Sequence, residues 1–258
     1  MDNRPVGIFD SGFGGLTAVA EFRRLMPNEN VVFFGDNARA PYGAKTPDEI
    51  KKCTGEIIDF LVSSGVKAVL AACGTISLNA GEVLKNAAVP SGNVLTPSVE
   101  YIASKEDKTP IGIIATAASV SSGAYERELR KAGVTREIIS IACPDFVTLI
   151  EAGVPYTDNR VNIAVEKYLE PVKKAGASLL LLGCTHYGII EPAIREYLGE
   201  ETEIVSASSC GARMLAELLK REGIEGGEGI TEYHTSGNKE EFRKTGSAIL
   251  GFDIGPIT

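Results

Sequence analysis

Short apolar runs alternate with helix-length segments along most of this chain, and this alternation limits the fold more than any other feature. The runs are residues 6–9, 31–34, 68–71, 111–114, 138–141, 179–182 and 203–205. Runs so short and so apolar are typical of strands that are buried on both faces of a parallel sheet. Segments of helical length lie between them at residues 47–64, 118–132, 159–175 and 209–222. The order predicts an α/β protein with right-handed crossovers.

Two pairs of strand ends resemble each other, which indicates an internal repeat. Residues 6–11 (VGIFDS) are similar to residues 111–116 (IGIIAT), and residues 68–73 (AVLAAC) are similar to residues 179–184 (LLLLGC). We therefore predict two similar parallel-sheet α/β lobes related by a pseudo-twofold axis. Residues 1–96 with 207–258 would form the first lobe and residues 97–206 the second. An active site is expected in the cleft between them.

Polar side chains gather where the predicted strands end, which is the edge at which parallel α/β sheets bind their ligands. They are Asp10, Ser11, Cys73, Thr75, Thr116, Ser119, Cys184, Thr185 and His186. If the two lobes face each other, Cys73 and Cys184 flank one cleft from opposite sides. A tuned thiolate is a general base and its thiol a general acid. Two facing thiols could therefore invert a carbon acid, one removing a proton and the other delivering one, with no cofactor.

Each of these cysteines has a neighbour that could tune it. His186 lies two residues after Cys184, and Asp10 ends the strand predicted to lie beside that of Cys73. An imidazole or a carboxylate that lies next to a thiol can exchange a proton with it. The alternatives are a loop histidine satisfied by the backbone, and an Asp10-Ser11 pair that only caps a helix.

The charge and the residue composition argue against several classes of binding site. The formal net charge is −8, so a general nucleic-acid backbone binder is unexpected. The five cysteines are widely spaced and only two histidines accompany them, so neither a disulfide framework nor a metal site is expected. The glycines near residue 14 lack the complete dinucleotide fingerprint.

The sequence also bears on location. No apolar stretch is long enough for a membrane span. The first residues lack the basic, apolar and small-residue order of a signal peptide. We therefore expect a cytoplasmic protein that does not bind a membrane.

Five segments resemble the bacterial glutamate racemase family, within the cofactor-independent aspartate/glutamate racemase superfamily. They are residues 7–17 (GIFDSGFGGLT), 34–43 (FGDNARAPYG), 122–125 (SGAY), 143–147 (CPDFV) with Glu151, and 183–187 (GCTHY). The similarity extends over nearly the whole chain. It implies two α/β lobes that enclose glutamate, a cytoplasmic enzyme that supplies D-glutamate for peptidoglycan, no cofactor, and a homodimer.

The same resemblance implies roles for individual residues. Cys73 and Cys184 would be the two catalytic acid/base residues, with Asp10 assisting Cys73, and Glu151 and His186 assisting Cys184. The residues expected to contact the substrate are Asp10, Ser11, Pro41, Tyr42, Gly43, Gly74, Thr75, Ser119, Thr185 and His186.

Several positions depart from the family pattern. Gly74 replaces an asparagine that follows the first cysteine, and the loss of one substrate hydrogen bond costs about 1 to 3 kcal/mol. The other departures are Asn37 and Ser119 for threonine, Ala115 for glycine and Gly188 for proline. Three hypotheses stay open: a glutamate racemase, a racemase of another amino acid such as aspartate, and a catalytically weak protein that binds a small acid.

Overall fold

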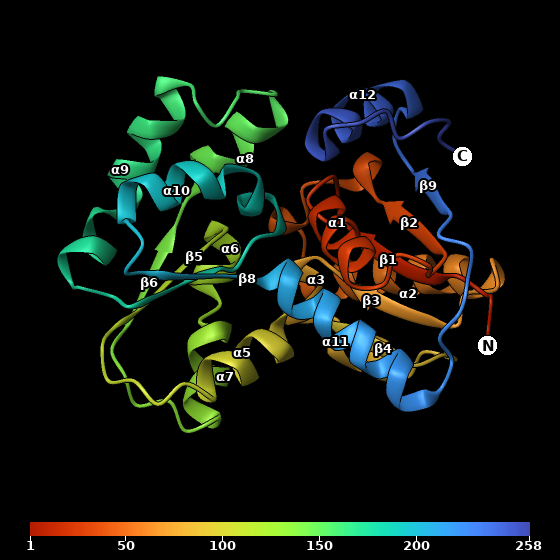
Figure 1. Cartoon of the computed structure of the whole chain (residues 1–258), viewed down its shortest axis with the longest axis horizontal. Coiled ribbons are helices and arrows are strands. Elements are labelled where there is room, and N and C mark those ends of the chain that lie inside the picture. Colours follow the sequence, from red (N-terminus) through yellow and green to blue (C-terminus); the bar gives the residue numbers. More distant parts are fainter.

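The computed structural model describes residues 1–258, in which two parallel β-sheets lie side by side with helices on their faces (Figure 1). The first sheet has the strand order β4-β3-β1-β2-β9. Its strands are β1 (Val6–Asp10), β2 (Val31–Gly35), β3 (Ala68–Ala71), β4 (Ser91–Asn93) and β9 (Thr231–Thr235). The second sheet has the order β6-β5-β7-β8. Its strands are β5 (Ile111–Ala115), β6 (Ile138–Ala142), β7 (Leu179–Leu182) and β8 (Glu203–Ser206).

The two sheets repeat one topology. The order β4-β3-β1-β2 of the first corresponds to β8-β7-β5-β6 of the second, and every pairing is parallel. This confirms the predicted fold class. β9 has no counterpart: it pairs with β2, so the chain returns to the first sheet after completing the second. The proposed lobe boundaries, 1–96 with 207–258 and 97–206, stay a prediction.

The helices connect successive strands and cover both sheets. They are α1 (Leu16–Leu25), α2 (Pro47–Ser63), α3 (Gly74–Asn79), α4 (Gly81–Lys85), α5 (Leu95–Ala103), α6 (Ala117–Ser121), α7 (Ala124–Lys131), α8 (Pro144–Glu151), α9 (Asn159–Lys174), α10 (Glu191–Leu198), α11 (Ala207–Glu222) and α12 (Lys239–Leu250). Three short 3-10 helices are η1 (Asn37–Arg39), η2 (Tyr42–Ala44) and η3 (Thr185–Ile190). α2 begins at a capping box formed by Thr46 and Glu49, which satisfies backbone N–H groups of its first turn.

Three local expectations need correction. The segment 118–132 is two helices, α6 and α7, because Gly123 adopts a left-handed conformation with φ of 61°. β4 and β9 were not expected, since their polar sequences lack the apolar run of a buried strand. Both lie at sheet edges, where a strand is not buried on both faces. β6 and β8 are edge strands too and are only partly buried.

α11 joins the two halves of the molecule. Leu215 and Leu219 belong to the hydrophobic core that α1 and β1 also build, whereas Cys210 belongs to the core around β5 and β7. Its apolar faces therefore contact both sheets. In Figure 1 this helix runs from beside β8 to the region below β3 and β4. A single helix thus ties the position of one sheet to that of the other.

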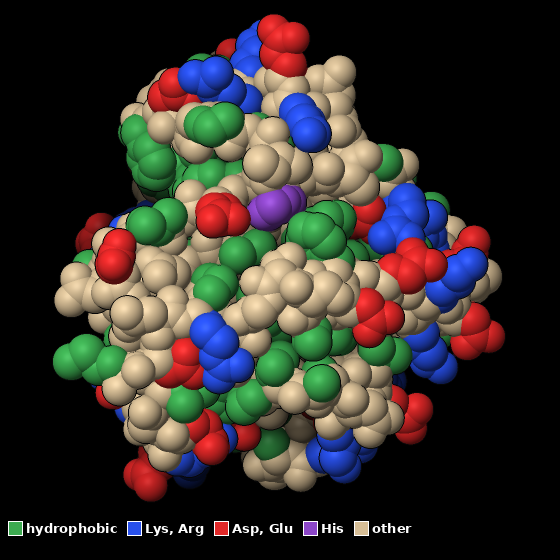
Figure 2. Space-filling view, turned by 90° about the vertical axis from the view of Figure 1, so that its right-hand side faces the viewer, with side chains coloured by type: hydrophobic (Ala, Val, Ile, Leu, Met, Phe, Trp, Pro, Cys, Tyr) green, Lys and Arg blue, Asp and Glu red, His purple; other side chains and the backbone are tan.

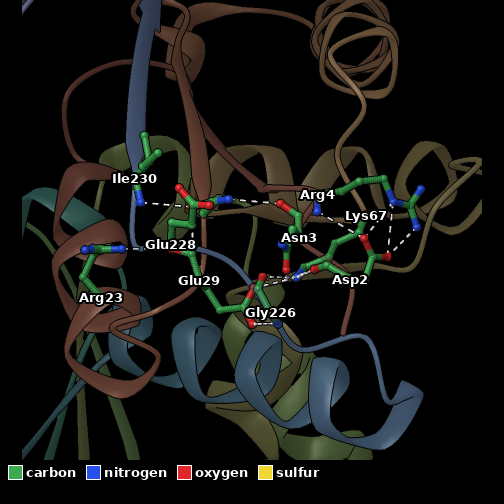
Figure 3. A network of polar contacts seen from close by, with 10 residues as sticks. Asp2, Asn3, Arg4, Arg23, Glu29, Lys67, Gly226, Glu228 and Ile230 are labelled. Carbon is green, nitrogen blue, oxygen red and sulfur yellow. Dashed lines mark hydrogen bonds and ion pairs between the residues drawn. The ribbon is translucent and has the colours of Figure 1, made fainter.

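A buried ion pair fastens the amino-terminal edge of the first sheet (Figure 3). Lys67 Nζ lies 2.7 Å from Glu29 Oε2, and both side chains are almost fully buried. The same ammonium donates hydrogen bonds to the carbonyl oxygens of Asp2 and Gly226. Glu29 Oε1 accepts a bond from the Gly226 N–H. The chain start and the segment that leads to β9 are therefore held together at the edge opposite the strand carboxyl ends.

Figure 2 shows the face that carries β9 and both chain ends, where hydrophobic side chains are scattered across the middle and charged side chains gather toward the margins. Phe60, Ile230 and Phe252 are exposed large hydrophobic residues of the first half of the fold and its carboxyl-terminal segment. None of the helices combines the length and the apolar character that crossing a membrane requires.

Candidate active site

A cavity of about 640 Å³ lies beyond the carboxyl ends of the central strands of both sheets. Its volume is typical of a site for a small molecule. Every residue that the sequence singled out as a site residue lines it: Asp10, Ser11, Pro41, Tyr42, Gly43, Cys73, Gly74, Thr75, Ser119, Glu151, Cys184, Thr185 and His186. Cys73 and Cys184 thus face one space from different sheets. The roles of these residues stay predictions.

On the first sheet, Cys73 is part of a chain of proton-carrying groups. Its Sγ lies 3.3 Å from Ser11 Oγ, and that hydroxyl donates to Asp10 Oδ1 over 3.3 Å. Burial raises the pKa of Cys73 to about 12; the charge of Asp10 adds to this rise, and the bond with Ser11 opposes it. Burial likewise raises the pKa of the Asp10 carboxyl. Cys73 is therefore protonated, as a thiol, at neutral pH.

On the second sheet, Cys184 is paired with a buried histidine. Its Sγ lies 3.8 Å from His186 Nδ1, and His186 Nε2 lies 3.1 Å from Glu151 Oε1. Burial works to lower the pKa of His186, but the hydrogen bonds with Cys184 and Glu151 outweigh it and raise the pKa to about 10. An imidazolium therefore lies beside Cys184 at neutral pH.

Two close contacts join the halves of the cavity. Thr185 Oγ1 donates a hydrogen bond to Asp10 Oδ2 over 3.1 Å, which links the loop after β7 to the end of β1. A β-carbon added at Gly14 would lie 2.2 Å from Thr185 Oγ1 and 2.5 Å from His186 Nδ1. Only glycine therefore allows the turn after β1 to lie against His186. Gly14 therefore serves the approach of this turn to the second sheet.

The cavity can recognise a charged amino acid without a lysine or an arginine. No lysine or arginine lines it, so carboxylates would bind to hydroxyls, to backbone N–H groups and to the His186 imidazolium. The lining hydroxyls of serine and threonine are those of Ser11, Thr75, Thr116, Ser119, Thr148 and Thr185. Asp10 and Glu151 offer acceptors for an ammonium group. The hydroxyl of Tyr42 is not free to bind a ligand in the same way, because it already donates a hydrogen bond to Asp36.

The structure adds residues that the predicted site lacked. Cys143, Pro144, Val147 and Thr148 form one wall, and Cys143 directly follows β6. The rule that ligands bind beyond strand carboxyl ends could have placed Cys143 there. Thr148 precedes Glu151 by about one turn of α8, so the two residues lie on the same face of the helix. A predicted helix ending at Glu151 could therefore have placed Thr148 in the site.

The positions at which the sequence departs from the family pattern differ in how closely other atoms surround them. A β-carbon at Gly74 would lie 2.8 Å from the carbonyl oxygen of Gly183, whereas one at Gly188 would meet nothing closer than 3.8 Å. Asn37 accepts a hydrogen bond from Thr235 Oγ1, which ties η1 to β9. Ser119 keeps a hydroxyl in the cavity, which accepts a bond from Thr116. Nothing in the structure explains alanine at position 115.

Comparison with known proteins identifies the family of the chain. Residues 16–215 match the family model described as Asp/Glu/Hydantoin racemase. The chain is 35% identical to a glutamate racemase from Geobacter metallireducens over 100% of this chain and 96% of that relative.

Solved structures give the same result. The glutamate racemase from Francisella tularensis, in complex with D-glutamate, superposes with a TM-score of 0.89 and 33% identity, covering 100% of this chain and 97% of that one. The isoform RacE1 of the Bacillus anthracis enzyme gives a TM-score of 0.91 and 30% identity over the same shares of the two chains. The resemblance found in the sequence is therefore confirmed, and the chain belongs to the Asp/Glu/Hydantoin racemase family of isomerases.

Proposed function

We propose that this protein is a glutamate racemase that interconverts L- and D-glutamate by proton transfer between Cys73 and Cys184. The observation that carries the proposal is that the two thiols line one cavity, each with its own proton-handling partners. The similarity to glutamate racemases, one of them bound to D-glutamate, supports glutamate as the substrate.

The reaction follows from one thiolate and one thiol on opposite faces of the α-carbon. The thiolate removes the α-proton, and the electron pair left on carbon delocalises into the neighbouring carboxylate. The opposite thiol then donates its proton to the other face of the same carbon, which inverts the configuration. Each turnover exchanges the roles of the two sulfurs, and no electron is gained or lost. No step calls for a cofactor.

The partners of the two sulfurs return protons between turnovers. Ser11 and Asp10 lie next to Cys73, whereas His186 and Glu151 lie next to Cys184. Hydroxyls and backbone N–H groups at the starts of α3 and α6 hold the carboxylates, and their dipoles stabilise the charge that develops on the reacting one.

The direct test is turnover of purified protein with each enantiomer of glutamate, followed by circular dichroism or chiral chromatography. We expect the optical signal to decay from both sides to the same racemic end point. Aspartate tested alongside separates the second hypothesis from the first. Turnover of aspartate alone would move the proposal to another substrate, and binding of glutamate without turnover would favour the small-acid-binding hypothesis.

The raised pKa of His186 has a consequence for stability. Its folded pKa of about 10 exceeds the ordinary 6.5, so its contribution to the free energy of unfolding is fully present below pH 6.5 and is lost as the pH rises to about 10. We expect wild type to exceed His186→Gln in unfolding free energy at pH 6, and the difference to shrink steadily toward pH 10. Urea denaturation of both proteins across this range checks it. A difference that grows with pH would contradict the assignment.

The family resemblance extends the proposal to physiology. An enzyme of this activity supplies D-glutamate for peptidoglycan in the cytoplasm, and we propose that role here. A homodimer is also proposed, on the family resemblance alone. Light scattering after size-exclusion chromatography gives the oligomeric state directly.

A further inference from the structure

The two residues that adjoin the reactive cysteines across the cavity are in contact with each other. Gly74 directly follows Cys73, and Gly183 directly precedes Cys184. A β-carbon at Gly74 would lie 2.8 Å from the Gly183 carbonyl oxygen, a distance that real β-carbons do not adopt. The neighbour is backbone, so it cannot turn aside as a long side chain can. The absence of a side chain at position 74 therefore lets the end of β7 lie directly on the start of α3.

Tyr125 fixes the other side of this contact. Its hydroxyl donates a hydrogen bond to the same Gly183 carbonyl over 3.2 Å. Its ring lies where a side chain at position 183 would be, because a β-carbon there would meet Tyr125 Cε2 at 3.0 Å. Tyr125 is itself only 3% exposed and belongs to the hydrophobic core around β5 and β7. The Gly183 carbonyl is thus held between a buried phenol and the backbone of Gly74.

The charge of either cysteine affects the Tyr125 hydroxyl. Burial raises the pKa of the Tyr125 hydroxyl, and negative charge on Cys184 and on Cys73 raises it further. Tyr125 does not line the cavity, but the carbonyl that it binds belongs to the residue before Cys184 and lies against the residue after Cys73. A change at Tyr125 therefore reaches both sulfurs through the backbone of Gly183 and Gly74.

We propose that the contact of Gly74 with Gly183, held by the Tyr125 hydroxyl, sets the separation of the two reactive thiols, and that Tyr125 is a positioning residue for racemisation. This inference rests on the proposed function. It gives the departure at position 74 a structural meaning: glycine here is an adaptation to a tight cleft and not only the loss of an amide that binds substrate.

The two meanings of Gly74 make opposite predictions for Gly74→Asn. If position 74 had merely lost a substrate contact, the asparagine would lower KM and raise turnover. If the glycine sets the spacing, the new side chain forces the Gly183 carbonyl away and separates the sulfurs. We then expect kcat to fall by about a hundredfold, since a displacement of about 1 Å costs on that order in a proton transfer. Gly74→Ala, which adds only the β-carbon, should show the same direction.

Tyr125→Phe tests the positioning residue while the ring and its packing are kept. We expect kcat for both enantiomers to fall by about tenfold, the loss that corresponds to one buried hydrogen bond, with KM changed less than kcat. The kinetic isotope effect for glutamate deuterated at Cα should rise, because a longer transfer makes that step more fully rate-limiting. The two enantiomers have equal free energy, so kcat/KM must fall equally in both directions, which checks the data internally.

Matched variants separate this effect from general damage. Tyr101→Phe removes a phenol from the surface helix α5, and Gly81→Ala adds a β-carbon that meets nothing within 4 Å. Both should keep wild-type kcat and isotope effect. If Gly74→Ala does not fold, the kcat and isotope effect of Tyr125→Phe still test whether this contact sets the separation of the thiols.

The possible results are distinct. Inactive wild type would refute the proposed function itself. Active wild type with unchanged kcat and isotope effect in Tyr125→Phe would overturn the inference alone, as would higher turnover in Gly74→Asn.

Discussion

Replacement of either reactive cysteine by alanine is expected to abolish racemisation of glutamate. Each substitution removes the only proton carrier on one face of the substrate, because neither Ser11 nor His186 can take over the position of the missing sulfur. A single acid or base contributes about 10² to 10⁴-fold to the rate. Racemisation needs both, so we expect a loss of at least about 10⁴-fold for Cys73→Ala and for Cys184→Ala, measured by circular dichroism from each enantiomer.

The chain provides a matched control for this prediction. Cys53 and Cys210 are also buried thiols, and neither lines the cavity. Cys53→Ala and Cys210→Ala delete the same atoms from the core and should leave turnover within a few-fold of wild type, about what a modest stability loss allows. Racemisation by Cys73→Ala or Cys184→Ala at the rate of these controls would contradict the two-thiol mechanism.

Lys67→Ala is expected to cause a large loss of stability without a direct effect on chemistry. Removing the ammonium leaves the Glu29 carboxylate buried without its partner and frees the carbonyls of Asp2 and Gly226. Breaking a buried pair costs about 3 to 5 kcal/mol, a large part of the total stability of a domain. For a chain of this length the melting temperature should fall by roughly 10 °C.

An exposed ion pair supplies the comparison. Lys131 lies 2.8 Å from Glu128 on the surface of α7, and Lys131→Ala should cost no more than about 1 kcal/mol. Below its melting temperature, Lys67→Ala should retain wild-type kcat, since the pair lies at the amino ends of the strands and the cavity at their carboxyl ends. Equal melting temperatures for the two variants would show that the buried pair contributes little.

The sequence was sufficient to bring the proposed reactive residues to one cavity. The apolar runs at residues 6–9 and 68–71 are β1 and β3, and the repeat indicated a second sheet of the same topology. Strand ends then located Asp10, Cys73 and Cys184, because the edge of a parallel sheet collects whatever follows its strands. The edge strands β4 and β9 could not be found in this way, since their polar residues carry no burial signal.

Contacts through glycine and backbone lay beyond the sequence. The approach of Gly14 to His186 and of Gly74 to Gly183 depends on how the two sheets are packed, which no local pattern records. Tyr125 is another example: a tyrosine in an amphipathic helix is typical of a core residue, and only the structure shows its hydroxyl bonded to Gly183. The buried pair of Glu29 and Lys67 likewise joins segments that are distant in sequence.

The most direct test of the central claim is racemisation of L-glutamate in D2O, with the Cα hydrogen of substrate and product followed by mass spectrometry after chiral separation. Two thiols that each serve one face exchange their protons with solvent between turnovers. Early in the reaction the D-glutamate formed should therefore carry deuterium at Cα, while the remaining L-glutamate keeps hydrogen. Deuterium that enters both enantiomers at the same rate from the start, or D-glutamate that retains the original hydrogen, would contradict proton transfer between Cys73 and Cys184.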